Sequence, residues 1–283
     1  MKRVLRSIYR MRSIMLAVAV VILIGFALLG PLLTEAVDPL RGVVAPVALV
    51  FGVLVSLIGP SFLPDQTPVT VTAPVRGRWL ALNSPASKIP SHGVRAYGQT
   101  YAIDWVYEPI DQQRPQFGDG PGMRRAAEYP AFGEPVYAMF GGTVQRASGW
   151  RRDHKSRAHM LAIVYMMVEG AIRELGGPGF ILGNHVVLRG DNGVYAVLAH
   201  LQQGSLQVQN GDIVMAGQLI GRCGNSGNSS EPHVHAQLMD RASILTAIGM
   251  PLAFASITLD NQPEVLDTLP RNGQIMTAER DSN

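Results

Sequence analysis

Two histidines separated by a single residue follow a polar loop that contains two glycines. Residues 223–237 read C-G-N-S-G-N-S-S-E-P-H-V-H-A-Q, with His233 and His235 near the end. In a strand, residues i and i+2 point to the same face, about 7 Å apart at a rise of roughly 3.3 Å per residue. Two imidazoles on one face can share a reaction centre, in which one binds a metal and the other handles the substrate or its proton. Short histidine pairs also arise by chance, so the preceding polar run gives this pair its specificity.

This run resembles a segment of the lysostaphin/LytM-type zinc metallopeptidases, which reads G-N-[ST]-G-x-S-x-x-P-H-[LV]-H. Members of that family cleave peptide bonds in bacterial cell-wall peptidoglycan. The likeness extends from about Pro74 to Gln237, with one interruption. Further matches occur in the family's order, which is more specific than any one match: a strand–turn–strand entry at Phe132–Val144, core strands at Gly183–Leu188 and Val194–Leu201, and a turn-rich run at Gln209–Gly221.

The resemblance implies roles for three histidines. In the family, the second histidine of the pair is a metal ligand and the first assists catalysis, which assigns these roles to His235 and His233. A further catalytic histidine lies in the family's Y-x-H-L strand, and His200 occupies the matching position in A-H-L. His200 and His233 would then orient a metal-activated water, transfer protons or stabilise the oxyanion.

The other two family ligands come from an H-x-x-x-D motif, and here the sequence departs from the family. Asp104 matches the aspartate, but Thr100 stands where the histidine is expected. The nearest candidate is His92, twelve residues before Asp104. A loop over 93–99 that folds back would return His92 to the metal. Zinc hydrolases usually have three protein ligands, so we predict one Zn²⁺ per chain, held by His92, Asp104 and His235.

Other polar residues leave alternatives open. His185 is a backup ligand or a structural residue, and His154 and His159 are predicted to lie at the surface. Cys223 has no cysteine neighbour, so we predict a small buried residue there. If His92 does not reach the metal, the protein would be a catalytically inactive binding or regulatory module for cell-wall enzymes. The loop before the histidine pair either binds substrate or satisfies its own turn; its polar residues are Asn225, Ser226, Asn228 and Ser229.

The N-terminal part of the chain has the composition of a membrane anchor. No charged residue occurs in 14–33 or in 43–63, and each stretch approaches the roughly 20 apolar residues that span a bilayer. We therefore predict two transmembrane helices in residues 1–70, at about 14–33 and 43–63, and a location at the cell membrane. A cleaved signal peptide is the alternative for the first stretch.

Charge does not fix which side of the membrane the remainder occupies. Five basic residues precede the first apolar stretch, which favours a cytoplasmic N-terminus. Two spans would then return the chain to the cytoplasm, whereas a cell-wall peptidase acts outside. A cytoplasmic ligand or peptide thus remains an alternative. The net charge is only +3 and these residues contribute five charges, so no nucleic-acid partner is predicted.

From residue 71 to 259, short apolar runs alternate with turn residues, which is typical of an antiparallel β domain. Asp191-Asn192-Gly193 predicts a tight hairpin. Between 150 and 179 the apolar period becomes helical, and Gly176-Gly177-Pro178 ends it, so we predict a helical insertion. The basic residues ahead of it form a solvated helix start or contact anionic lipid or substrate. Residues 260–283 are predicted to be a polar, poorly ordered tail. The apolar positions of the insertion are Leu161, Val164, Tyr165, Val168, Ile172 and Leu175.

Overall fold

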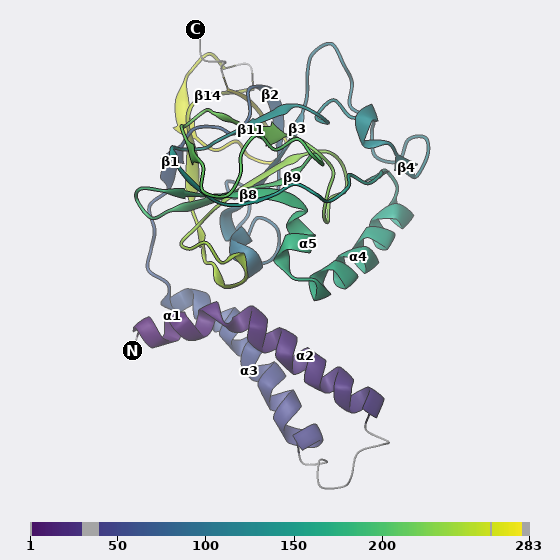
Figure 1. Cartoon of the computed structure of the whole chain (residues 1–283), viewed down its shortest axis with the longest axis vertical. Coiled ribbons are helices and arrows are strands. Elements are labelled where there is room, and N and C mark those ends of the chain that lie inside the picture. Colours follow the sequence, from purple (N-terminus) through teal and green to yellow (C-terminus); the bar gives the residue numbers. More distant parts are fainter. Residues whose placement is uncertain (1, 30–39, 261, 279–283) are drawn as a thin grey trace. The chain divides into compact units, whose positions relative to one another are not determined.

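The computed structural model describes residues 2–29, 40–260 and 262–278, and it divides into two compact units, Met1–Gln66 and Thr67–Asn283 (Figure 1). The first unit is helical. Its elements are α1 (Lys2–Arg10), α2 (Arg12–Leu29), η3 (Leu40–Val44), α3 (Ala45–Ile58) and η4 (Gly59–Phe62). Most of the predicted connection between the two apolar stretches lies outside the described residues.

One stretch of the first unit, Gly42–Phe62, is long and apolar enough to cross a bilayer. A second stretch, Arg3–Arg10 with Arg12–Leu28, meets the same criterion only if its 47° bend lies within one span. Within this unit α2 packs on α3 at Gly52, where a Cβ atom would lie 2.8 Å from Cδ2 of Leu16. A small residue at a helix contact allows such close approach. The structure thus supports one candidate span, and a second only conditionally.

The second unit is mainly β (Figure 1). Its large sheet has twelve strands along the path β1-β14-β16-β2-β3-β12-β9-β8-β6-β10, with β13 beside β12 and β15 beside β14. The strands are β1 (Val69–Val71), β2 (Gly77–Leu82), β3 (Ile103–Tyr107), β6 (Gly142–Ser148), β8 (Asn184–Gly190), β9 (Tyr195–Leu201), β10 (Ile213–Val214), β12 (Val234–Met239), β13 (Gly249–Met250), β14 (Leu252–Leu259), β15 (Leu266–Thr268) and β16 (Ile275–Ala278).

The sheet is mixed rather than purely antiparallel, because β1 and β14 pair in parallel. The predicted hairpin at 191–193 is confirmed: β8 and β9 pair in antiparallel fashion, and Gly193 adopts φ 77°. Two small sheets and five helices complete the described part of this unit. These are β5 (Pro135–Tyr137) with β11 (Leu219–Arg222), β4 (Met123–Arg124) with β7 (Ser156–Arg157), and η5 (Ala96–Tyr101), η6 (Ala126–Glu128), α4 (Met160–Leu175), α5 (Pro178–Leu182) and η7 (Ile244–Thr246).

Both faces of the central strands are buried. On β9, Ala196 and Leu198 belong to one apolar cluster, whereas Val197 and Ala199 belong to another. Successive side chains of a strand point to opposite faces, so the two clusters lie on the two sides of the sheet. The first cluster includes Trp79, Trp105 and Phe254; the second includes Leu182, Met239 and Ile244.

The C-terminal segment differs from the predicted polar tail. Within the described residues, β16 lies between β14 and β2 in the large sheet, and Met276 is fully buried. The sequence there reads I-M-T-A, too short an apolar run for an unambiguous strand signal. The helical insertion is present as α4 and α5. Gly176 caps α4 as the sequence predicts, but Pro178 opens α5 instead of ending the helical segment.

An ion pair between Arg157 and Glu169 fixes α4 to β7. Arg157 Nη2 lies 2.6 Å from Glu169 Oε2, and the arginine side chain is only 4% exposed. We expect Glu169→Gln to lower the free energy of unfolding by about 2 kcal/mol, because it leaves a buried guanidinium without its anion. Denaturant unfolding followed by tryptophan fluorescence measures this. Glu128→Gln, which breaks an exposed pair with Arg124, should cost less than about 1 kcal/mol; equal losses would contradict the prediction.

Candidate metal centre

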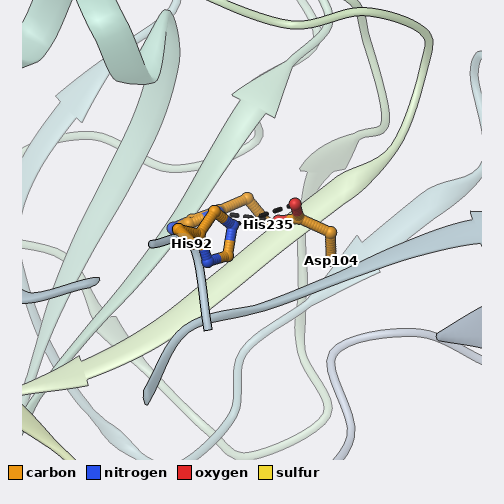
Figure 2. Close-up of side chains that lie close together, drawn as sticks. All are labelled: His92, Asp104 and His235. Atoms are coloured by element: carbon orange, nitrogen blue, oxygen red, sulfur yellow. Dashed lines mark hydrogen bonds and ion pairs between the residues drawn. The ribbon is translucent and has the colours of Figure 1, made fainter. Parts of the chain in front are cut away.

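The centre of the site is the pairing of β3 with β12. In that antiparallel register His235 lies directly opposite Asp104. Ile103 and Trp105 belong to the first apolar cluster, so strand alternation turns Asp104 to the other face. Val234 and Ala236 also belong to the first cluster, so His235 between them points to the same face as Asp104. The two side chains meet, with His235 Nδ1 2.8 Å from Asp104 Oδ1 (Figure 2).

His92 joins this pair through a loop that folds back on itself. The Ser91 backbone N–H donates to the Thr100 carbonyl at 3.2 Å, which closes the segment between them. Tyr97 and Gly98 adopt φ of 57° and 75° within it, a left-handed turn that reverses the chain. His92 Nε2 then lies 2.9 Å from Asp104 Oδ2 (Figure 2). The loop thus folds back and brings His92 to Asp104.

The hydrogen bonds of Gln237 assign the protonation of His235. Gln237 Nε2 donates to the Tyr97 carbonyl at 2.7 Å, so its Oε1 faces His235 Nε2 at 2.9 Å. An amide oxygen only accepts, and His235 Nε2 must therefore carry the hydrogen. In the neutral imidazole, Nδ1 then presents a lone pair to the carboxylate of Asp104.

His92 shows the same arrangement. The Ser91 hydroxyl donates to the Gln99 carbonyl, and its oxygen lies 3.0 Å from His92 Nδ1. The hydroxyl oxygen thus accepts from Nδ1, and Nε2 of His92 presents a lone pair to Asp104. His233 presents a third lone pair to the carboxylate. Its Nδ1 donates to the Glu231 carbonyl at 2.8 Å, and its Nε2 lies 3.7 Å from Asp104 Oδ1.

Several electron pairs thus converge on one buried carboxylate, an arrangement that suits a shared cation. Burial raises the pKa of Asp104, but the surrounding imidazoles of His92, His233 and His235 outweigh it and hold the pKa of Asp104 well below its usual value, so the carboxylate is ionised. Asn83 Nδ2 also donates to Asp104 Oδ2 at 2.8 Å. One ligand atom each from His92, Asp104 and His235 lie within 4.8 Å of one another. Two imidazole nitrogens and a carboxylate fit a zinc ion, with the outer nitrogens held by acceptors as in known metal sites.

His200 lies beside this cluster in a strained backbone conformation. Its ring centroid is 4.6 Å from that of His233, and its φ is 58°, a value uncommon outside glycine and asparagine. Nδ1 donates to the Ser226 carbonyl at 2.8 Å, so Nε2 carries the lone pair. Burial, followed by the neighbouring imidazoles of His233 and His235, holds the pKa of His200 well below its usual value. The ring is therefore neutral at neutral pH.

A cleft of about 550 Å³ opens over these residues. Its floor includes Asp104 and the four histidines described above, and one wall comes from α4. Asn228, at the rim, has a buried Oδ1 without a hydrogen-bond partner among the described residues. The wall residues from α4 are Met166, Met167, Gly170, Ala171 and Glu174.

The polar loop before the histidine pair mostly supports the structure. Ser226 Oγ donates to the Leu201 carbonyl and accepts from the Asn184 N–H. The Asn225 N–H donates to Asp153, and Ser229 Oγ donates to the Glu231 carbonyl. Of these four loop residues, Asn228 and Ser229 line the cleft, and Asn228 Oδ1 has no hydrogen-bond partner among the described residues. Of the two alternatives left open by the sequence, support of the loop's own turn holds for Ser229, whereas Asn225 and Ser226 bond to segments distant in the sequence.

The remaining candidates lie outside the cluster. His185 is fully buried and bonds the Gly183 carbonyl through Nδ1, and Cys223 is buried as predicted. His154 and His159 are only partly exposed: His154 Nε2 bonds the Gly227 carbonyl, and His159 Nε2 bonds that of Gly120. His154 therefore packs against the polar loop before the histidine pair and His159 against the turn at Gly120, so neither is a free surface residue.

His185 predicts an acid sensitivity of the fold. Burial, assisted by Arg146 and Arg151, lowers its pKa to about 4 from 6.5. His185 is protonated in the unfolded chain below about pH 6.5, but in the folded chain only below about pH 4. The free energy of unfolding therefore decreases as the pH falls through that window. The loss reaches about 3 kcal/mol. We expect His185→Phe to remove it, as measured by denaturant unfolding at pH 7 and pH 4. An unchanged pH dependence in His185→Phe would overturn this assignment.

Two supporting residues, Gln237 and Ser91, are absent from the sequence-based candidates. Gln237 follows His235 by two positions and so shares its strand face, a signal sufficient to find it. Ser91 precedes His92 but acts only because the loop folds back. Asn83 lies on a different turn and has no comparable signal.

Comparison with known proteins identifies the domain. Residues 122–246 match the model of peptidase family M23. The match includes His200, His233 and His235, whereas His92 and Asp104 lie before it. A mainly β unit with a buried His-Asp-His cluster defines a candidate metal-binding protein. The match of this segment to peptidase family M23 supports the lysostaphin/LytM-type resemblance that the motifs predict.

Solved structures of this type are distant in sequence. The catalytic domain of the antimicrobial peptidase lysostaphin from Staphylococcus simulans is 21% identical, with a TM-score of 0.32 over 58% of this chain and 83% of that one. A putative glycyl-glycine endopeptidase lytM from Ruminococcus gnavus is 18% identical, with a TM-score of 0.29 over 53% of this chain and 42% of that one. The chain thus spans less than half of the Ruminococcus protein. The family assignment rests on the family model.

Proposed function

We propose that this chain is a membrane-anchored zinc metallopeptidase that hydrolyses peptide bonds in bacterial cell-wall peptidoglycan. The observation that carries the proposal is the convergence of imidazole lone pairs from His92, His235 and His233 on the single carboxylate of Asp104. Hydrogen bonds from the rest of the fold enforce this orientation, and a bound cation resolves the repulsion. The match of residues 122–246 to peptidase family M23 supports peptide hydrolysis as the reaction.

His92, Asp104 and His235 would hold the zinc ion. When bound, zinc acts as a Lewis acid that polarises a carbonyl and makes water a stronger nucleophile near neutral pH. His200, neutral and with its Nε2 lone pair free of the Ser226 bond, would accept a proton from the attacking water. His233 Nε2, next to it, would orient the same water or share the proton. These two roles follow from the tautomers, since both Nδ1 atoms donate to backbone carbonyls.

The domain borders follow from the same proposal. Residues 1–70 would anchor the chain through one or two apolar helices, and 71–259 would form the peptidase domain, with β15 and β16 completing its sheet. The partners would be a bilayer and a peptide of peptidoglycan, either a stem or a cross-bridge. The cleft of about 550 Å³ admits an extended peptide segment.

The test combines metal analysis with hydrolysis. Full-length chain, purified in detergent, is assayed for zinc by mass spectrometry and then incubated with purified peptidoglycan, whose fragments are identified by mass. We expect near-stoichiometric zinc and newly exposed amino groups, both abolished by a chelator and restored by added zinc. Stoichiometric zinc without hydrolysis of any wall peptide would overturn the peptidase assignment and favour a binding module. Absence of zinc from folded chain would overturn the metal centre.

A further inference from the structure

The outer face of α4 is apolar and exposed. Six side chains on it are 49–85% exposed. At about 100° per residue they fall within an arc of about 100° of the helix circumference, and no charged residue of α4 lies in that arc. An apolar stripe at helical spacing normally faces a protein core, but this one faces solvent. Its members, here called the outer stripe, are Leu161, Val164, Tyr165, Val168, Ile172 and Leu175.

The opposite side of α4 holds small and charged residues. Ala162 and Gly170 are buried there. Glu169 pairs with the buried Arg157 and also accepts from Arg173 Nη2 at 3.1 Å. Glu169 is therefore turned toward the domain, and its ion pair with Arg157 anchors α4 to β7. The outer stripe faces solvent because the ion pairs fix the rotation of the helix.

The outer stripe is distinct from the wall of the cleft. The residues of α4 that line the cleft, such as Met166, Gly170 and Glu174, lie on the inner side and one edge of the helix. No member of the outer stripe lines the cleft. Tyr97 fixes this edge, because its hydroxyl donates to Glu174. A partner on the outer stripe would thus leave access to the cleft open.

Residues near the stripe have the chemistry of a membrane interface. Trp150 is 65% exposed, and its ring lies 6.5 Å from that of Phe180, on α5 next to α4 (Figure 1). Arg151 stacks on both rings, 4.4 and 4.5 Å from their centroids. Exposed tryptophan, tyrosine and arginine are enriched where a protein meets lipid headgroups. Arg152 and Lys155, both exposed, precede α4 and would face anionic lipid.

The chain itself would bring a bilayer within reach. Six residues, 63–68, join η4 to β1, and at most about 20–25 Å separate the ends of such a segment. A bilayer crossed by 42–62 would therefore lie close to the start of β1. This short tether makes the bilayer the most concentrated apolar partner available to the domain.

From the outer stripe and its surroundings, we propose that α4 is an interfacial helix that lies in the headgroup region of the bilayer and orients the peptidase domain on the membrane surface. This inference rests on the membrane span of the proposed function, but not on its peptidase activity. A helix in the plane of the interface buries its apolar face about 5–10 Å into the boundary between headgroups and acyl chains.

Fluorescence quenching tests the placement. A full-length Ile172→Cys variant, labelled with an environment-sensitive dye, is reconstituted in vesicles of phosphatidylcholine and phosphatidylglycerol that contain a nitroxide-labelled lipid. The matched control is Ile213→Cys on β10, an isoleucine that is 83% exposed. Cys223 is fully buried and should not react, which unsubstituted chain verifies. We expect quenching about threefold or more stronger at 172 than at 213, because only the stripe enters the acyl boundary.

Four further outcomes decide the proposal. Val168→Glu added to Ile172→Cys should reduce quenching to the level of position 213, because it places a charge in the outer stripe. Equal, weak quenching at both positions would overturn the proposal. A blue-shifted dye at 172 that the lipid does not quench would also overturn it, since a second copy of the chain then covers the stripe. Failure of the chain to float with the vesicles would refute the membrane span itself, whereas hydrolysis of peptidoglycan would be unaffected.

Discussion

Replacement of His235 by alanine is expected to release the zinc ion and abolish peptide hydrolysis. His235 Nδ1 is one of three ligand atoms around the centre, and two protein ligands hold zinc poorly. The zinc content should fall from about one per chain to background, and kcat/KM by at least about 10³-fold, because zinc supplies both the activation of water and the polarisation of the carbonyl. Zinc is measured by mass spectrometry and kcat/KM with a synthetic wall peptide.

The same measurement on His92→Ala tests whether His92 is a zinc ligand in place of the histidine that the family has at the position of Thr100. It should also lose zinc, because no other described histidine, aspartate, glutamate or cysteine completes the cluster. The matched control is His159→Ala, whose ring bonds the Gly120 carbonyl outside the cleft; it should keep zinc and activity. Zinc retained at full occupancy in His92→Ala would show that His92 is not a zinc ligand and that another residue takes its place. Normal circular dichroism in each variant separates metal loss from unfolding.

The strand at the centre of the site was accessible from sequence because its signal is local. A histidine pair at strand spacing after a turn-rich run fixes which side chains share a face. The structure bears this out in the register that sets His235 opposite Asp104. The mainly β fold follows from the same alternation of apolar runs and turns.

The position of His92 could not be predicted from the local sequence pattern alone. Nothing between Ser91 and Thr100 specifies a return path in the sequence, apart from Gly93 and Gly98. The fold supplies it through the hydrogen bonds of Ser91 to Gln99 and Thr100 and through the left-handed turn at Tyr97. Long-range closure of this kind depends on packing of η5 against the sheet, which spacing alone does not encode.

The reversed orientation of α4 shows a second limit. Helical periodicity predicts where a helix forms, but it does not say what its apolar side contacts. Here the ion pairs of Glu169 decide the rotation, and they depend on Arg157 from β7. In the same way, a short apolar run became β16 because β14 and β2 each leave an edge for it to pair with. Neither outcome can be read from composition.

Replacement of His200 by asparagine is expected to leave the zinc content unchanged while lowering kcat by about 10²–10⁴-fold, the usual contribution of a positioned acid–base group. Asparagine is the suitable substitute because it tolerates the left-handed conformation that His200 adopts, at φ 58°. Alanine at that position would add backbone strain to the chemical change. KM should change little, since His200 is assigned a role in proton transfer rather than in substrate binding. Steady-state kinetics with a wall peptide and zinc analysis of the same preparation measure both effects.

The outcome separates three roles for this ring. Unchanged zinc with reduced kcat supports proton transfer at Nε2, the atom left free by the Nδ1 bond to Ser226. Loss of zinc would instead make His200 a ligand, which its distance from the His92–Asp104–His235 cluster does not support. Full kcat would leave His233 to act alone, and His233→Asn should then reproduce the entire loss. Because burial keeps His200 neutral well below pH 6.5, acidification from pH 8 to pH 6 should not by itself titrate this base.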